Sequence, residues 1–377
     1  MKKKLAIIHY QPLEDYPPIQ NFLNDIADKK YNIDLLVLTS KSNKWNWAFS
    51  LPNGLVVRLP MPTKEQPLII RMLYYWYFNL SCLLRLIVYR PGVVLYYEST
   101  SAWPVWAYSK VFKTNILIHY HEYFTKVQYP KQMWLDRFNH KLEVSSLYNK
   151  AKWISHTNKD RLAFFRQDYA IKEDDICLEV FPNYPPSNWI VQNKKNIAYK
   201  SLPLRLVYVG SLSLNNTYLQ ELVKWVEIQN GSVELSVYSY NLDMDTKNFL
   251  ERIQSPFVEF NIEGLRYSEI PKTLHRYDVG IIFYKPYSKN VVYCAPNKFF
   301  EYLACGLDVW FSKELTGLHH FKQTEFAPKV VEVDFRNLGS YDFLSMITED
   351  MKFSSSFYTA ENAQKPLIQF ICDLLSE

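Results

Sequence analysis

Side chains that could do chemistry gather most densely between residues 296 and 306, where Lys298 and Glu301 stand one helical turn apart. An apolar run over 279–284 precedes this stretch and another over 309–311 follows it. This order predicts a strand, a loop, a helix and a second strand. Open α/β sheets bind ligands where the carboxyl ends of parallel strands meet, so we expect the helix start there. Backbone N–H groups at a helix start suit phosphate, and Lys298 adds a positive charge. Glu301 can accept hydrogen bonds from two vicinal hydroxyls, as in a ribose.

This stretch resembles the nucleotide-sugar signature of GT-B glycosyltransferases, particularly the family 4-like enzymes of bacterial polysaccharide assembly. The residues that match the signature are Asp278, Val279, Gly280, Pro296, Lys298, Glu301, Tyr302, Ala304, Gly306 and Val309. Asp308 stands where the family usually has proline. The resemblance implies that Pro296, Asn297 and Lys298 meet the donor diphosphate and that Glu301 binds the ribose. The alternative is an ordinary βαβ unit with a proline at its helix start.

Three positions of the chain differ from the family pattern. Ser211, which follows Gly210 at the end of a predicted strand, replaces an arginine, and Asn215 lies near the position of a family lysine. Serine and asparagine can donate hydrogen bonds to a diphosphate, although more weakly than a cation does. Tyr293 stands where the family has the first of two glutamates, and it can hydrogen-bond a sugar but cannot act as a carboxylate. The turn over 9–15 also lacks the glycine pair of the family.

A further candidate for nucleotide binding follows the predicted strand 258–260. The family packs this turn on the nucleobase, so the resemblance implies that Arg266 and Tyr267 cover the base by stacking. An ordinary turn is the alternative.

The predicted strand 116–120 ends in a second group of polar side chains. His121 and Glu122 follow it, at a position where related glycosyltransferases carry a histidine and an acid. The resemblance implies that this pair positions an acceptor hydroxyl or stabilises the leaving pyrophosphate. His119 points to the other side of the strand from Tyr120 and fits a core histidine. A purely structural role for the histidines stays open, whereas a metal site lacks a third ligand at a diagnostic spacing.

Two domains of α/β type are predicted from the length of 377 residues and from the alternation of apolar runs with helical patterns. Predicted strands cover 5–10, 33–38, 56–58, 93–97, 116–120, 153–156, 204–210, 234–238, 258–260 and 279–284. Predicted helices cover 19–27, 67–88, 103–112, 134–149, 216–228, 245–253, 267–275 and 366–375. The proline-rich segment 180–186 is the predicted linker. We expect an acceptor-binding domain over 1–183, a nucleotide-sugar-binding domain over 184–355, and a final segment over 356–377 that packs back on the first domain.

The charge of the chain is unevenly distributed. Residues 1–190 hold 24 Lys and Arg against 16 Asp and Glu, a net charge of +8, although the whole chain carries +5. A basic first half suits an anionic partner such as a membrane surface or a pyrophosphate-linked lipid, or is simply a solvated face. Nucleic acid is disfavoured because the cations are scattered and no nucleic-acid motif is present. The five cysteines are isolated from one another, which favours a reduced, cytoplasmic protein.

The most hydrophobic segment, 72–88, contains Arg85 and is flanked by Arg71 and Arg90, so it is too short and too polar to span a bilayer. Its central part, 73–78, is apolar nearly all round and rich in tyrosine and tryptophan, which suit a membrane interface. We favour the alternative that this helix is buried against the sheet.

Together these observations predict a GT-B protein, with two doubly wound Rossmann-like domains facing across a cleft. The predicted activity is transfer of a sugar from a UDP- or GDP-sugar to a hydroxyl of a growing polysaccharide, such as capsule or lipopolysaccharide, or of a lipid-linked oligosaccharide. The resemblance implies retention of configuration and no metal or other cofactor. We expect a cytoplasmic location, with peripheral contact to the inner membrane face. A non-catalytic nucleotide- or partner-binding GT-B subunit and, less favoured, a nucleotide-sugar 2-epimerase are the alternatives.

Overall fold

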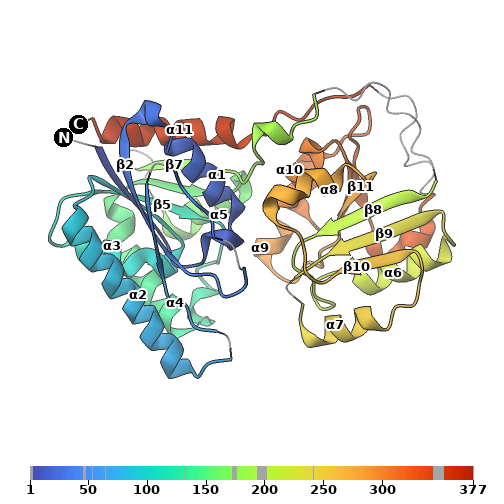
Figure 1. Ribbon diagram of the computed structural model, residues 1–377, viewed down its shortest axis with the longest axis horizontal. Coiled ribbons are helices and arrows are strands. Elements are labelled where there is room, and N and C mark those ends of the chain that lie inside the picture. Colours follow the sequence, from blue (N-terminus) through green and yellow to red (C-terminus); the bar gives the residue numbers. More distant parts are fainter. Residues whose placement is uncertain are drawn as a thin grey trace. The chain divides into compact units, whose positions relative to one another are not determined.

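The structure is a computed structural model that describes residues 3–45, 48–52, 54–63, 65–131, 133–171, 176–192, 202–240, 242–342 and 352–376. The chain forms two compact units (Figure 1). Unit 1 combines Met1–Pro182 with Ala360–Glu377, and unit 2 is Asn183–Thr359. Unit 2 is therefore an insertion between two parts of unit 1.

Unit 1 is built on a seven-stranded parallel sheet with the order β3-β2-β1-β4-β5-β6-β7. The strands are β1 (Lys3–His9), β2 (Ile33–Ser40), β3 (Leu55–Leu59), β4 (Val93–Tyr97), β5 (Asn115–Tyr120), β6 (Ala151–His156) and β7 (Cys177–Val180). All five residues of β4 are buried, because helices cover both faces of the sheet and leave no solvated side.

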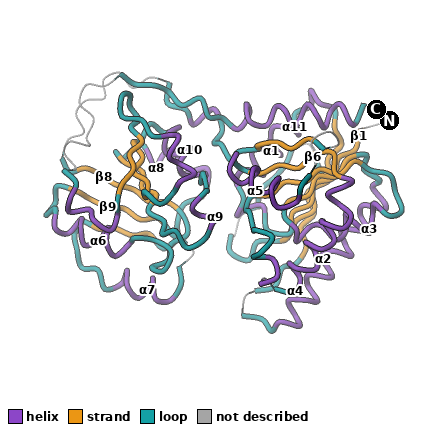
Figure 2. The backbone as a smooth tube through the Cα atoms, turned by 180° about the vertical axis from the view of Figure 1, so that it is seen from behind, coloured by secondary structure: helices purple, strands orange, loops and turns teal. Residues whose placement is uncertain are grey.

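Two groups of helices cover the faces of this sheet (Figures 1 and 2). One face packs on α1 (Pro17–Ile26) and on the last helix, α11 (Ala360–Leu374). The other packs on α2 (Leu68–Tyr89), α3 (Ala102–Ser109) and α5 (Lys159–Tyr169), and α4 (Trp134–Leu142) lies against α3. The short 3-10 helices are η1 (Leu13–Asp15), η2 (Lys29–Tyr31), η3 (Ser99–Ser101), η4 (Tyr129–Lys131) and η6 (Tyr148–Lys150), and η5 (Glu143–Leu147) is a π-helical turn.

Unit 2 repeats this plan with a six-stranded parallel sheet in the order β10-β9-β8-β11-β12-β13. The strands are β8 (Leu204–Val209), β9 (Val233–Tyr238), β10 (Val258–Asn261), β11 (Val279–Ile282), β12 (Asp308–Ser312) and β13 (Val330–Val333). One face packs on α6 (Leu219–Ile228) and α7 (Met244–Glu251), and the other on α8 (Ile270–Leu274) and α10 (Asn297–Ala304). The short elements are η7 (Ser187–Trp189), η8 (Tyr267–Glu269), α9 (Lys289–Val292), η9 (Thr316–Phe321) and η10 (Phe335–Ser340).

The predicted fold class is confirmed: both units are parallel α/β layers, and the last helix packs back on unit 1. Leu367, Ile368 and Ile371 of α11 are buried among residues of α1 and β1. This return of the chain completes one face of the first sheet.

Two expectations about helices were wrong in part. The predicted helix 134–149 ends at Leu142, and a π-helical turn and a 3-10 turn follow. The apolar segment 73–78 is only partly buried: Tyr75 and Phe78 face the sheet, but Leu73 is 64% exposed and Tyr77 is 52% exposed. Among the described residues, no helix is both long and apolar enough to cross a membrane.

Candidate functional site

Lys298 lies in the first turn of α10, at the carboxyl edge of the sheet of unit 2. Its ammonium donates to the phenolic oxygen of Tyr208 over 3.1 Å. The same nitrogen lies 4.2 Å from the centre of the Tyr208 ring and 5.1 Å from that of Tyr284. Because the helix macrodipole and the ammonium are both positive here, this edge favours an anion such as a diphosphate.

Gly210 lies directly beside this lysine, at the end of β8. Its φ of +142° is strained for other residues, and its N–H donates to the carbonyl of Tyr238 over 3.0 Å. A Cβ at this position would collide with the Nζ of Lys298. Glycine therefore leaves the space that the ammonium occupies, and the structure brings the two predicted residues together.

Glu301 lies one turn further along α10 and is 8% exposed. Burial raises the pKa of its carboxyl to about 7, against the opposing effect of the Lys298 charge. No side-chain hydrogen bond to Glu301 occurs within the described part of the chain. A buried carboxylate without such partners, next to a cation, is suited to bind the hydroxyls of a ligand.

Two residues of the signature have a packing role. A side chain at Gly280 in β11 would collide with the ring of Tyr302, so the close approach of α10 to the sheet requires glycine there. The hydroxyl of Tyr302 accepts the N–H of Val209 over 3.1 Å, at the end of β8. The pair Gly280 and Tyr302 thus fixes the position of the helix that carries Lys298 and Glu301.

The loop after Gly210 has a cation beside it that the sequence did not suggest. Ser211 is exposed, and its carbonyl accepts from the hydroxyl of Tyr208 over 2.5 Å. Asn215 is also exposed. Lys285, two residues after Phe283, donates from its ammonium to the carbonyl of Leu214 over 2.9 Å. It supplies a positive charge beside the loop where the family pattern has cations.

The remaining predicted residues of unit 2 lie on loops. Arg266 is exposed, and its backbone N–H donates to Glu269 over 3.1 Å. The ring of Tyr267 packs on Trp189 at 4.6 Å between ring centres, so it belongs partly to the core. Tyr293 follows α9 and is half-buried.

A short turn connects Tyr293 to α10, the helix that carries Lys298. Pro296 is the N-cap of α10, with its carbonyl accepting from the N–H of Phe299 over 2.9 Å, and Asn297 is the first helical residue.

In unit 1, His121 directly follows β5 and is buried in an aromatic cluster. Its ring is stacked on Tyr97 at 5.3 Å and lies 4.8 Å from the ring of His119 and 6.1 Å from that of His9. Its carbonyl accepts from Arg161 over 2.5 Å. His119 is fully buried and bonds to Ser155 over 2.9 Å, which fits the predicted core histidine.

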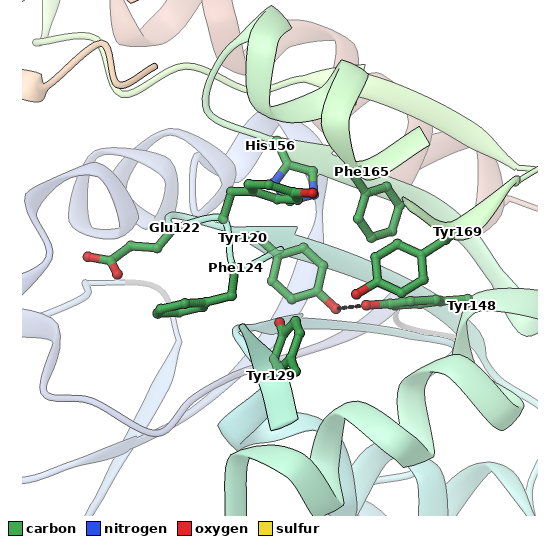
Figure 3. Close-up of a pocket in the computed structure, with 9 residues that line it drawn as sticks. Tyr120, Glu122, Phe124, Tyr129, Tyr148, His156, Phe165 and Tyr169 are labelled. Carbon is green, nitrogen blue, oxygen red and sulfur yellow. Dashed lines mark hydrogen bonds between the residues drawn. The ribbon is translucent and has the colours of Figure 1, made fainter. Parts of the chain in front are cut away.

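Glu122 is exposed, whereas His121 is buried. Glu122 lies at the rim of a small pocket and points away from the aromatic side chains (Figure 3). The residues that line this pocket are Tyr120, Glu122, Tyr123, Phe124, Tyr129, Tyr148, His156, Phe165 and Tyr169. The hydroxyls of Tyr120 and Tyr148 are 3.1 Å apart (Figure 3).

Behind the pocket lies a buried carboxylate, Glu143, in the π-helical turn. It accepts hydrogen bonds from Tyr96 at 2.9 Å, Ser99 at 2.5 Å and Tyr120 at 2.7 Å. Burial raises the pKa of Glu143 to about 7, although these hydrogen bonds oppose the shift. This carboxyl is the first residue of the π-helical turn that follows α4, where the predicted continuous helix is interrupted.

Sequence reasoning missed Glu98, which follows β4 at the same edge of the sheet. One carboxyl oxygen accepts the backbone N–H of His121 over 2.6 Å and of Glu122 over 3.3 Å. Burial, and then repulsion from Glu122, raises the pKa of Glu98 to about 8. Its φ of 62° and ψ of 151° are almost restricted to glycine. A strained, perturbed carboxyl that holds the two predicted residues is a candidate functional group.

The sequence could have indicated Glu98 through its position, because it directly follows a five-residue apolar strand in the same way that His121 follows β5. No group of three His, Cys, Asp or Glu suited to a metal ion occurs among the residues that the structure describes.

No protein-family profile matches the chain, and no curated protein matches it in sequence. Solved structures do share its fold. Sucrose-phosphate synthase from Thermosynechococcus elongatus is similar with a TM-score of 0.62 at 14% identity, over 99% of this chain and 96% of the synthase. WaaG, a glycosyltransferase involved in lipopolysaccharide biosynthesis, is similar with a TM-score of 0.59 at 10% identity, over 98% of this chain and 94% of WaaG. A UDP-N-acetylglucosamine 2-epimerase is similar with a TM-score of 0.56 at 10% identity, over 98% of this chain and 95% of the epimerase. Such similarity, over nearly the whole length of each protein, shows that this chain has the GT-B fold.

Proposed function

We propose that the protein is a glycosyltransferase that moves a sugar from a nucleoside diphosphate donor to a hydroxyl acceptor. The observation that carries this proposal is the pairing of a buried carboxyl, Glu301, with an ammonium, Lys298, on one helix at the ligand-binding edge of unit 2. A ribose diphosphate presents the matching groups, two vicinal hydroxyls and an anion.

In this proposal, unit 2 holds the nucleotide. Glu301 accepts hydrogen bonds from the ribose hydroxyls. Lys298, Pro296, Asn297 and the loop Gly210–Ser211 meet the diphosphate, and Lys285 adds charge beside that loop. Arg266 and Tyr267 cover the base, and Tyr293 hydrogen-bonds the donor sugar.

The leaving diphosphate gains negative charge as the bond to the sugar breaks. A fixed ammonium and the positive end of α10 stabilise that charge without the help of a metal, which is the basis for proposing a metal-independent reaction. Retention of the sugar's configuration is proposed from the resemblance to family 4-like enzymes.

Unit 1 would position the acceptor. His121 and Glu122 lie nearest to the reacting hydroxyl in this proposal, and Glu98 keeps their backbone in place through its two hydrogen bonds. A carboxyl with a pKa near neutrality is also suited to exchange a proton with a hydroxyl. The proposed acceptor is a growing polysaccharide or a lipid-linked oligosaccharide, used on the cytoplasmic side of the membrane.

Nucleotide binding by Glu301 and Lys298 can be tested by thermal unfolding with UDP, GDP or ADP, each with Mg²⁺ or with a chelator. At a hundred times its dissociation constant, a ligand stabilises the folded state by about 2.7 kcal/mol. We expect one nucleotide to raise the Tm of the wild type by a few degrees with or without Mg²⁺. The same concentration should leave Glu301→Ala and Lys298→Met unshifted.

Matched controls are Glu227→Ala and Lys224→Met, exposed residues on α6 of the same unit. They should keep the full shift. If no nucleotide shifts the wild type, or if the control variants lose the shift as well, the proposed nucleotide site is wrong.

Because a 2-epimerase shares the fold, epimerase activity has to be distinguished from glycosyl transfer by experiment. A glycosyltransferase releases the nucleoside diphosphate as it transfers the sugar to an acceptor, whereas a 2-epimerase yields a nucleotide sugar in which the configuration of the sugar is changed. Following both products from one UDP-sugar distinguishes them. Binding of the nucleotide without either product would favour the non-catalytic subunit, to which Ser211 and Tyr293 lend some support by their departure from the family pattern.

A further inference from the structure

Helix α2 carries a stripe of exposed apolar side chains along its length. This stripe, called the α2 stripe below, consists of Ile69, Leu73, Tyr77, Leu80, Leu84, Ile87 and Val88. At 3.6 residues per turn these positions fall within an arc of roughly 100°. Their exposed fractions range from 36% to 84%, whereas Phe78, Cys82 and Leu86 on the other side of the helix are fully buried. A continuous apolar surface of this length marks an interaction site rather than an ordinary solvated face.

Aromatic side chains extend this surface from α2 to α3 and α4. The ring of Trp76 lies 5.2 Å from that of Trp103 and 6.3 Å from that of Phe138. Phe138 in turn stacks on Trp134 at 5.6 Å, and Trp134 is 50% exposed. Tryptophan and tyrosine are the side chains that favour the boundary between water and lipid, because each combines a large apolar ring with a polar group.

The basic residues nearest to the α2 stripe flank it on both sides. These are Arg85 and the C-cap residue Arg90, whereas Arg71 lies on the opposite side of the helix. Helix α2 contains no acidic residue. Lys110 follows α3 with its ammonium 5.4 Å from the centre of the Trp106 ring. Lys141 is exposed and lies two turns after Trp134 on the same side of α4. The one acid of α4, Asp136, lies on the opposite side of that helix from Trp134.

We propose that the α2 stripe, together with Trp134, binds the surface of an anionic lipid bilayer, with α2 lying in the plane of the head groups. The apolar side chains would enter the boundary between head groups and acyl chains, while the arginines and lysines meet lipid phosphates. A second copy of the chain is a poorer partner, because it would bring the same arginines together without any acid on α2 to pair with them. The surface lies wholly within unit 1, so the inference does not depend on the nucleotide site.

Sedimentation with sucrose-loaded vesicles tests this inference with the full chain. We expect binding to vesicles of phosphatidylcholine mixed with phosphatidylglycerol, weak binding to phosphatidylcholine alone, and weaker binding at high salt. Leu80→Asp should weaken partitioning by about tenfold, because a carboxylate then enters the apolar boundary. Lys141→Glu should weaken binding to the mixed vesicles and leave binding to phosphatidylcholine unchanged.

The matched control is Ile228→Asp, since Ile228 is an apolar residue of unit 2 that is 68% exposed at the end of α6. It should sediment like the wild type, and an unchanged Tm of all variants shows that they are folded. Binding that Leu80→Asp retains in full, or no binding to either type of vesicle, overturns the proposal. A dimer in solution that Leu80→Asp dissociates, without vesicle binding, would instead assign the α2 stripe to a second copy of the chain.

Discussion

At the scale of single residues, Glu301 combines burial with a nearby cation. Its carboxyl has a raised pKa of about 7 because burial disfavours the charged form more strongly than Lys298 favours it. The ionised carboxylate accepts hydrogen bonds from two hydroxyls through both of its oxygens, and it holds them more strongly than the protonated carboxyl, whose O–H is itself a donor. Nucleotide binding at this site should therefore depend on pH in the physiological range.

We expect the affinity for the preferred nucleotide to rise between pH 6 and pH 8, approaching tenfold per pH unit below the pKa of Glu301. Isothermal titration calorimetry across this range measures the effect. Glu301→Gln should bind weakly and with a flat pH profile. An equally steep profile for Glu301→Gln would assign the titration to another group.

Gly210 controls the position of Lys298, because a side chain at Gly210 would occupy the space of the ammonium. Gly210→Ala should displace Lys298 and strain the backbone by about 1–3 kcal/mol, which lowers both the nucleotide affinity and the Tm. Gly339→Ala is the matched control, since a Cβ at Gly339 meets no atom within 4 Å and its φ is not positive. Equal effects of the two substitutions would show that the lysine does not depend on Gly210.

Glu98 offers a test of stored backbone strain. Glu98→Gly loses the hydrogen bonds to the backbone of His121 and Glu122 but relieves the strained φ, whereas Glu98→Ala loses the same bonds and keeps the strain. We expect Glu98→Gly to be more stable than Glu98→Ala by about 1 kcal/mol or more in urea unfolding. Equal stability of the two variants would mean that the backbone relaxes without cost.

At the scale of helices and strands, α11 is the element whose loss should matter most to unit 1. Leu367 is fully buried in the core that α1 and β1 share. Leu367→Ala should therefore reduce the free energy of unfolding by about 2–5 kcal/mol. Urea denaturation followed by tryptophan fluorescence, to which Trp153 beside Phe370 of α11 contributes, measures it.

The control for this helix is Lys365→Ala, an exposed position on α11 that should change stability by less than about 0.5 kcal/mol. A small effect of Leu367→Ala, similar to that of the control, would contradict a structural role of α11 in unit 1.

Most of the elements could be predicted from the sequence because the strands of a parallel sheet are continuous apolar runs. β4 begins and ends at the predicted residues, and α10 begins one residue after the predicted proline. The elements that escaped prediction include β7, which has four residues and an exposed glutamate, and α5, which has eleven residues but buries only Arg161, Leu162 and Phe165. Local pattern is weak when an element is short or mostly polar.

The candidate site was predictable only where one helix carries several of its residues. Lys298 and Glu301 are neighbours because a helix repeats every 3.6 residues, so spacing alone places them together. Glu98 depends instead on the pairing of β4 with β5 and on an unusual φ, neither of which a single sequence specifies. For segment 73–78 of α2 the sequence favoured a buried helix over an exposed one for a related reason: its composition is apolar on nearly every side, and only the packing decides which side is covered.

At the scale of the whole molecule, two sets of buried or partly buried groups have opposite effects on stability as the pH changes. The carboxyls of Glu98, Glu143 and Glu301 have pKa values raised by burial to about 8, 7 and 7 from a usual 4.5. The imidazoles of His9, His119 and His156 have pKa values lowered by burial from 6.5, to about 3 for His156. These carboxyls and imidazoles therefore stay neutral in the folded protein at pH values where the same groups are charged in the unfolded chain.

Each set has its own pH window. The stability from the carboxyls is complete below pH 4.5 and is lost as pH rises through about 7 and 8, because the unfolded chain then ionises while the folded one does not. The stability from the histidines is complete above pH 6.5 and is lost as pH falls below it, because the unfolded chain then binds protons.

We expect Tm to be highest between about pH 4.5 and 6.5, because there the gain from the histidines with rising pH offsets the loss from the carboxyls, and to fall on both sides. Each such group contributes about 1.4 kcal/mol per pH unit. Calorimetry at constant ionic strength measures the profile. Glu143→Gln should flatten the alkaline side and leave the acid side unchanged. A maximum near pH 8 would mean that the buried carboxyls ionise in the folded protein.

The insertion of unit 2 between two parts of unit 1 also has a consequence for synthesis on the ribosome. The core of unit 1 needs Leu367, Ile368 and Ile371, which are translated after the whole of unit 2. Unit 2 has all of its own strands once Thr359 has emerged, whereas the first sheet, translated earliest, waits with one apolar face covered only in part, by α1. The unit that is begun first is thus the one that is completed last.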